Sequence, residues 1–339
     1  MVGLGMERVY HSRLDMRRFS HILGPLFGVT LLLIASAVLY EKLSILSLAD
    51  VQESLRKISH ARIAAALALT AVYYVLITGY DALSFKVIGH PLPYRKIALA
   101  AFTGYAFSHN VGLTAVSSGS VRYRVHSSFG LTAKESAKVI VFSSLSFWIG
   151  FLAVCTIVFL LLPVRSAAAL HLPFSLRFFG WISLTLLILY GWYTMFARHG
   201  RKIGSFDLPK INPKVFFLQL LIGSLDWIVA SSIVFVLLPH ADAGLFPKFF
   251  GMFVLAQVSG LVSQVPGGIG VFESVMILLL PKHSPRAAII SVLLIYRAIF
   301  YILPLIVATV LLATHEVRMT AKNRVKKHES ASPRPGKAP

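Results

Sequence analysis

The sequence predicts an all-α polytopic membrane protein, on the evidence of its composition, its apolar runs and the placement of its basic residues. Hydrophobic residues make up 56% of the 339 positions and charged residues only 14%, outside the range of soluble globular proteins. Several apolar runs reach about 20 residues, the length that an α-helix needs to cross a bilayer. The 33 basic residues gather in short loops and tails between these runs, as the positive-inside rule leads us to expect.

Uninterrupted apolar runs of spanning length are expected to form transmembrane helices. They cover residues 22–40, 63–80, 139–162, 178–196, 215–238 and 287–314. The first run contains Ala35-Ser36-Ala37, which imitates a signal-peptidase site. Because the run continues to Tyr40, a retained first helix is favoured over a cleaved signal peptide.

Two further apolar segments, 97–120 and 249–280, are interrupted near their middles. The first breaks at SHNVG, residues 108–112, and the second at SQVPGG, residues 263–268, followed by Gly270. Pro266 removes a backbone donor and neighbouring glycines weaken a helix, so the second segment should break there. Broken backbone inside a bilayer is tolerated only where it is buried in protein or lines a wet cavity. Both interruptions are therefore candidate sites, with Pro266, Gly270 and Gly112 as the residues that break the helices.

The charges in the loops predict how the interrupted segments run. Basic residues on both sides of segment 97–120, in the loop near 198–214 and in the C-terminal tail all favour the cytoplasm. Two re-entrant hairpins, each returning to the side from which it enters, satisfy these constraints together. The sequence thus predicts about six transmembrane helices plus two re-entrant helical hairpins, arranged as inverted repeats at about 63–162 and 215–314. The alternative is eight plain transmembrane helices.

The domain organisation follows from this topology. We expect a cytoplasmic N-terminal segment at 1–21, a single integral-membrane domain at 22–316 and a basic, disordered cytoplasmic tail at 317–339. Both termini would then lie in the cytoplasm.

Motif spacing and composition argue against several function classes. The net charge of +20 suggests nucleic acid, but the basic residues follow the loops, so no nucleic-acid partner is expected. The one cysteine, Cys155, allows no intrachain disulfide, and the twelve histidines show no metal-ligand spacing. A partial dinucleotide fingerprint at 268–273 lacks its third glycine, and there is no Walker motif. No metal and no cofactor is predicted.

Charged side chains at membrane depth are costly, so each marks a candidate site. Asp226 lies near the middle of run 215–238, and Arg297 lies in the last run with Tyr301 one turn further on. Glu273 opens the half-helix after the second break, where it is either a site residue or a helix cap. An ion pair of Arg297 with Glu273 or Asp226 that only locks the bundle is the structural alternative.

The second break supplies groups that suit a phosphate. Backbone amides at the start of a half-helix bind anions, and a guanidinium holds a phosphate in a fixed fork. The predicted headgroup site there comprises Ser263, Gln264, Gly267, Gly268 and Arg297.

The first break offers His109 and Asn110, with Arg122 and Arg124 shortly after it. The two arginines would face lipid headgroups or simply fix the topology. His109 is either a proton relay or a hydrogen-bonded structural histidine. Asp81, directly after run 63–80, is expected at an interface and carries less weight.

Residues 263–273, SQVPGGIGVFE, followed by Tyr296-Arg297 and then Leu303-Pro304-Leu305, resemble the lysylphosphatidylglycerol synthase/flippase transmembrane family. GYAFSHNVG, from residue 104, with SSGSVRYR, from residue 117, is similar to the first-half signature of that family. The resemblance covers about residues 22–316. It implies an inner-membrane lipid-handling module that, in two-part members, moves aminoacylated phosphatidylglycerol across the bilayer. Those members continue into a soluble synthase domain, which does not follow here, so aminoacyl transfer is not expected.

The sequence favours a bacterial inner-membrane lipid flippase or translocase that handles an anionic or aminoacylated phospholipid and is not itself an enzyme. Membrane phospholipids are the expected partners, with a separate lipid-modifying synthase as a further one. The alternatives are a membrane subunit or enzyme of glycolipid or lipid-modification synthesis, and an assembly partner of a separate synthase.

Overall fold

The computed structural model describes residues 53, 56, 58–111, 114–162, 175–196, 200–203, 206–208, 210–238, 242–263, 266–280 and 286–331. The predicted first helix at 22–40, Gly112 and Gln264 lie outside these residues. The described chain is almost wholly helical, with one antiparallel strand pair, β1 (Arg201–Ile203) and β2 (Phe206–Leu208).

Six helices of the described chain are long and apolar enough to cross a membrane. This confirms an all-α polytopic membrane protein. By length and composition these helices are His60–Ile88 (α3), Ala133–Leu161 (α6), Leu176–Phe196 (α7), Pro213–Leu237 (α8), Ala243–Ser263, which contains α9 (Phe246–Ser263), and Ala288–Ala321, which contains most of α11 (Arg286–Arg297) and part of α12 (Leu303–Ala331). The segment 249–280, predicted to be a re-entrant hairpin, thus contributes one helix of spanning length.

Local signals in the sequence set several helix ends. α3 ends at Gly89, whose left-handed φ of +74° lets its N–H reach the carbonyl of Phe85 at 3.1 Å. α6 begins with a capping box, in which the backbone N–H of Thr132 donates to Glu135 at 2.8 Å and Glu135 N–H donates to Thr132 Oγ1 at 3.3 Å. These contacts satisfy backbone groups that the helix itself leaves unpaired.

The two interrupted segments each form a pair of packed helices. α4 (Tyr94–Val111) packs against α5 (Thr114–Ser128), and α9 packs against α10 (Val271–Leu279). The first break was predicted at 108–112, and α4 stays helical through residues 108–110 and ends at Val111, within that interval. The second break occurs where it was expected.

The second break is a glycine turn. α9 ends at Ser263 and a short 3-10 turn, η3 (Pro266–Gly268), follows. Gly267, Gly268 and Gly270 all adopt positive φ, at +62°, +60° and +80°, a region that side chains with a Cβ rarely enter.

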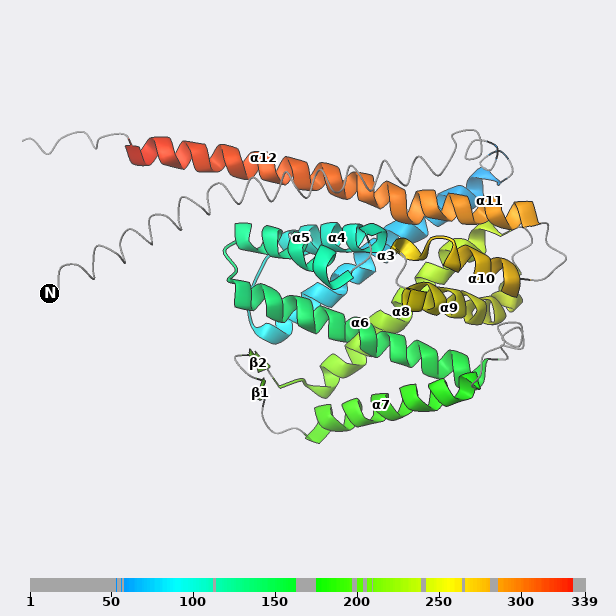
Figure 1. Ribbon diagram of the computed structural model, residues 1–339. Helices are drawn as coiled ribbons and strands as arrows, with labels where there is room; N and C mark the ends of the chain where they lie inside the picture. Colours follow the sequence, from blue (N-terminus) through cyan, green and yellow to red (C-terminus); the bar gives the residue numbers. More distant parts are fainter. Residues whose placement is uncertain are drawn as a thin grey trace, which may run out of the picture.

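The helix packing relates the two predicted repeats. α3 and α8, the first helices of each, pack against one another, and α6 packs against both of them. η3 and α12 both contact α4, so the second helix pair and the last helix meet the first helix pair. In Figure 1, α12 lies along one edge of the bundle and α7 along the opposite edge.

The last helix is interrupted by a π-helical turn, η4 (Ala298–Ile302), directly before α12. Beyond the apolar span, α12 continues to Ala331. The prediction of a disordered tail from residue 317 is therefore wrong as far as Ala331, since this part of the chain continues the helix.

Candidate functional site

Glu273 and Arg297 form an ion pair that also holds the glycine turn. Oε1 of Glu273 accepts from Nε of Arg297 at 2.7 Å, and its Oε2 accepts from the backbone N–H of Gly270 at 2.7 Å. Arg297 Nη1 donates to the carbonyl of Gly267. Glu273 is thus a helix cap and an ion-pair partner at once, and the pair ties the last helix to the turn before α10.

A cavity of about 210 Å³ lies beside this ion pair. Nearly all of its accessible lining is apolar, although four polar residues take part in it. One of them, Arg297, has its guanidinium 4.6 Å from the ring centroid of Tyr301. The polar lining residues are Asn110, Glu273, Arg297 and Tyr301, and the apolar ones are Ile269, Ile290, Leu293, Leu294 and Ile302, with Gly270 between them.

Asn110 brings the first helix pair to this cavity. Its Nδ2 donates to the carbonyls of Ala106 at 2.8 Å and of Tyr301 at 3.1 Å. The first bond is to its own helix, whereas the second crosses to the π turn of the last helix. The two breaks predicted from the sequence therefore contribute to one site.

The π turn is held from α3 as well. Pro304 has no N–H, so it cannot donate to the carbonyl of Phe300 four residues earlier. The hydroxyl of Tyr74 donates to that carbonyl instead, at 3.3 Å. π turns inside α-helices often occur at functional sites, and this one borders the cavity.

His109 lies among aromatic rings rather than in an open channel. Its Nδ1 lies 3.4 Å from the hydroxyl of Tyr74, and its ring stacks on Phe300 with centroids 5.8 Å apart. This environment fits the structural reading of His109, while a role in proton transfer stays a prediction.

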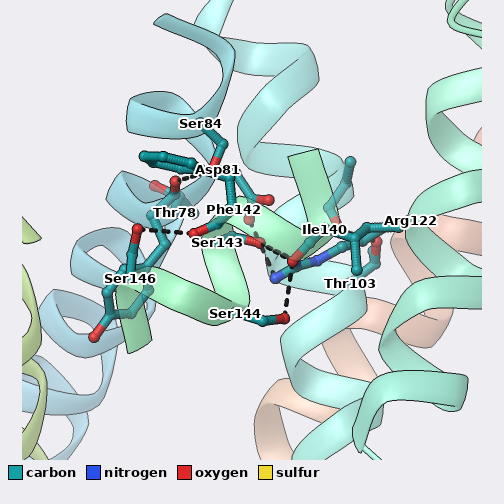
Figure 2. Close-up of polar contacts among 12 residues, drawn as sticks. Thr78, Asp81, Ser84, Thr103, Arg122, Ile140, Phe142, Ser143, Ser144 and Ser146 are labelled. Carbon is teal, nitrogen blue, oxygen red and sulfur yellow. Dashed lines mark hydrogen bonds and ion pairs between the residues drawn. The ribbon is translucent and has the colours of Figure 1, made fainter. Parts of the chain in front are cut away.

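Arg122 is a buried residue and not a boundary residue, and Asp81 is its partner. Nη2 of Arg122 lies 3.2 Å from Oδ2 of Asp81, with side chains only 3% and 1% exposed. Nη1 donates to Ser143 Oγ at 2.8 Å, and the guanidinium lies 4.0 Å from the ring centroid of Tyr105. Figure 2 shows how Asp81 and Ser143 approach Arg122 from two other helices. A headgroup-facing Arg122 is therefore wrong for this structure. Asp81, for which an interface position was expected, lies buried inside the bundle as the partner of Arg122.

Arg124, two residues further on, makes a different contact. Its Nε and Nη2 donate to Glu316 at 2.8 and 2.7 Å, with side chains 26% and 15% exposed. This two-pronged pair joins α5 to α12. Arg124 is therefore not part of the cavity.

Asp226 pairs with a tyrosine instead of with Arg297. Its Oδ2 accepts from the hydroxyl of Tyr80 at 2.9 Å, between α8 and α3. The carboxylate is 4% exposed, and no ion pair joins it to a basic side chain of the described residues. Of the two ion pairs proposed for Arg297, the one with Glu273 forms.

The remaining predicted residues of the second break take structural positions. Ser263 Oγ donates to the carbonyl of Gly260 at 2.7 Å. Gly268 lies against Gly260, so that a Cβ at Gly268 would come within 3.3 Å of the Cα of Gly260. Gly267 reaches Arg297 through its carbonyl, while the anion-binding role of its amide stays a prediction.

The structure also shows residues that the sequence analysis did not single out. Tyr74 and Ser143 were not distinguishable from other polar residues of apolar helices. The one available signal was Pro304, whose missing N–H implies a free carbonyl at Phe300 that some donor must satisfy. Within the described part of the chain, no group of three metal-ligating side chains occurs.

Comparison with known proteins shows which family this sequence belongs to. The family described as "Lysylphosphatidylglycerol synthase TM region" matches residues 22–308. An uncharacterized protein of Synechocystis is 40% identical over 84% of this chain and 88% of its own length. Inner membrane protein YbhN of Escherichia coli is 29% identical over 81% of this chain and 87% of its own length.

Longer relatives match as well. The phosphatidylglycerol lysyltransferase of Staphylococcus haemolyticus is 23% identical over 90% of this chain but over only 35% of its own length. The part shared with it is thus about a third of that protein. With a family match across most of its length, the chain belongs to the lysylphosphatidylglycerol synthase TM region family.

Proposed function

We propose that this protein is a flippase- or translocase-like protein of the bacterial inner membrane that handles an anionic or aminoacylated phospholipid. The observation that carries the proposal is the cavity with aliphatic walls beside the Glu273–Arg297 pair. The apolar walls suit the apolar body of a phospholipid, and the ion pair beside them suits its charged headgroup. Arg297 is suited to the phosphate, because a guanidinium binds phosphate oxygens in a fixed geometry.

The proposal includes two re-entrant hairpins, α4 with α5 and α9 with α10, in inverted repeats. α10 has nine residues, too few to cross a bilayer as a helix. η3 packs against α4, which supports hairpins whose tips meet inside the protein. Broken helices that meet at a substrate site are a recurring arrangement in transporters. In this topology both termini lie in the cytoplasm.

The longer relatives support a lipid substrate for this chain. They also support a separation between lipid handling by this chain and lipid modification by another protein. They are named for lysyl transfer to phosphatidylglycerol, and the shared third of their length corresponds to this chain. We assign this chain a role in lipid handling and no bond-making step. A separate lipid-modifying synthase is proposed as its partner.

The test is lipid movement in proteoliposomes that contain the purified protein and fluorescent phosphatidylglycerol. A reducing agent outside the vesicle quenches the label on the outer leaflet, so the slow phase reports movement from the inner leaflet. Arg297→Ala is expected to slow this phase at least tenfold, the effect of about 1.4 kcal/mol. Arg318→Ala, at an exposed position on α12, is the matched control and should move lipid like the wild type.

Folding must be measured alongside movement, because Arg297 also holds the glycine turn. Arg297→Lys keeps the charge but loses the forked geometry, so it should fold and still move lipid slowly. Equal lipid movement by the wild type and a folded Arg297→Ala variant would remove this cavity from the mechanism.

A further inference from the structure

The cavity beside the Glu273–Arg297 pair follows one face of the last helix and is open at one end. Its lining includes residues spaced three or four positions apart, which share a helix face: Ile290, Leu294, Arg297 and Tyr301. Ile290 is 46% exposed, whereas Tyr301 is buried, so the open end lies at Ile290. In the proposed membrane topology, an exposed apolar side chain on this helix of spanning length faces lipid. A lipid chain can therefore reach the cavity from the bilayer.

The polar lining residues bond to one another and to the backbone instead of facing the cavity. Glu273 accepts from Arg297 and from the backbone of Gly270, and Asn110 donates to the carbonyl of Tyr301. The accessible lining is almost wholly apolar. The side chains of Arg297 and Glu273 are 12% and 25% exposed, and little of that exposed area faces the cavity. A headgroup can thus approach the ion pair from outside the cavity.

Water and headgroups are poor occupants of such a cavity. An ordered water needs about 2–4 polar partners, and apolar cavities stay dry. A headgroup would lose its hydrogen bonds to water inside an apolar lining. A hydrocarbon chain has no such bonds to lose, and it gives the lining atoms the packing contacts that an empty space lacks. The chemistry of the lining therefore favours hydrocarbon.

The size of the cavity limits how much hydrocarbon it holds. An apolar cavity of roughly 150 Å³ takes up one benzene molecule. By the same ratio, the 210 Å³ of this cavity has room for about eight chain carbons. That is a segment of one acyl chain, and two chains side by side would not fit.

We propose that this cavity holds a segment of a single acyl chain, while the headgroup stays outside it at the Glu273–Arg297 pair and the second chain remains in the bilayer. The inference rests on the proposed function for the identity of the lipid, and it assigns each part of that lipid a place. Leu293 and Ile302, which line the cavity and are buried, would then contact the chain although bulk lipid does not reach them.

Photoreactive lipids test this placement. A set of phosphatidylglycerols, each with a diazirine at a different position along one acyl chain, is reconstituted with the purified full chain. After irradiation, mass spectrometry of peptides identifies the labelled residues. We expect label on Leu293 and Ile302 in addition to lipid-facing residues such as Leu189 on α7, which is exposed. Label confined to exposed residues would overturn the inference.

A cavity-filling variant adds a functional readout. In Leu294→Trp the indole takes the room of about two methylenes, each worth about fourfold in affinity. Label at Leu293 and Ile302 should fall about tenfold, and lipid movement should slow with it. Leu189→Trp makes the same change at an exposed position outside the cavity and should alter neither. Thermal unfolding shows whether both variants fold, and Leu294→Phe with Leu189→Phe replaces the pair if Leu294→Trp does not.

The outcomes separate this inference from the proposed function. Lipid movement without label at Leu293 and Ile302 would point to another occupant, such as residues 22–40 of the chain. It would overturn the inference and leave the proposed function standing. Label that persists unchanged in a folded Leu294→Trp variant would also overturn the inference. Label at both residues without movement of any lipid would refute the proposed function and leave the acyl-chain site.

Discussion

Gly150 on α6 and Gly223 on α8 stand in backbone contact: a Cβ at Gly150 would lie 2.3 Å from the Cα of Gly223. Real Cβ atoms essentially never come so close to another heavy atom. Small residues let helices approach in this way in membrane proteins, where close packing takes over part of the role of the hydrophobic effect. α8 in turn packs against α3, so this contact supports the centre of the bundle.

Gly150→Val should force these two helices apart. We expect the free energy of unfolding to fall by about 1–3 kcal/mol, the range typical of an overpacked interior. A lower thermal unfolding midpoint in detergent would show this loss. Gly119→Ala is the control, because a Cβ at that position would meet no atom within 4 Å apart from the chain neighbours and backbone of its own helix. Equal midpoints for the wild type and Gly150→Val would show that the helices do not meet as described.

Arg122 and Arg124 should differ strongly although they are two residues apart. Arg122→Ala leaves the carboxylate of Asp81 buried without its partner, which costs about 3–5 kcal/mol. Arg124→Ala breaks a partly exposed pair with Glu316 and should cost about 1 kcal/mol or less. Thermal unfolding of both variants measures the difference, and similar losses would contradict the burial of the Asp81 pair. Asp81→Leu combined with Arg122→Met should recover much of the stability, since it leaves no charge unpaired.

Tyr74 and Pro304 should be energetically coupled through the carbonyl of Phe300. Tyr74→Phe removes the donor to that carbonyl and should cost about 1–3 kcal/mol. Pro304→Ala restores a backbone N–H that can reach the same carbonyl. In the Pro304→Ala background, Tyr74→Phe is therefore expected to cost less, by about 0.5–1.5 kcal/mol in a double-mutant cycle. Strictly additive losses would mean that the proline does not create the need for Tyr74.

We expect the fold to need a hydrogen-bond acceptor for the hydroxyl of Tyr80 at position 226, but not a negative charge there. Asp226→Asn keeps an oxygen that accepts from the hydroxyl of Tyr80, so stability should change by less than about 1 kcal/mol. Asp226→Leu leaves that hydroxyl unpaired in a buried site and should cost about 1–3 kcal/mol. If Asp226→Asn folds normally but no longer moves lipid, the charge of Asp226 acts in transport. A loss of folding in Asp226→Asn would assign the charge a structural role.

Features that depend on neighbouring residues were predictable from the sequence. Apolar runs gave five of the six helices of spanning length in the described chain, because helix length against bilayer thickness is a local property. Proline and glycine gave the second break at its observed place for the same reason. The pairing of Arg297 with Glu273 was one of two alternatives, and choosing between them required the fold.

Features that depend on distant residues were not predictable. Asp81 ends an apolar run, so it looked like an interface residue, yet α3 continues to Ile88 and places it inside the bundle. The burial of Arg122 needs Gly104, where a Cβ would come within 2.6 Å of the Arg122 side chain. No pattern in one segment reveals such a fit.

Two predictions, the start of the first break and the disorder of the C-terminal tail, differ from the structure for local reasons. The first part of the break predicted at 108–112 is helical, because the amide of Asn110 bonds to its own helix and to Tyr301, and so supports the helical turn. The basic composition of the tail suggested disorder. However, neither glycine nor proline occurs between Pro304 and Pro333, so nothing stops α12 at the end of its apolar span.

The π turn ties the last helix to α3 and to both helix pairs. Tyr74 from α3 and Asn110 from α4 hold main-chain carbonyls within this turn, and Arg297, directly before it, holds the carbonyl of Gly267. A rotation of the helix at this turn would pull on both broken helix pairs in a single stroke.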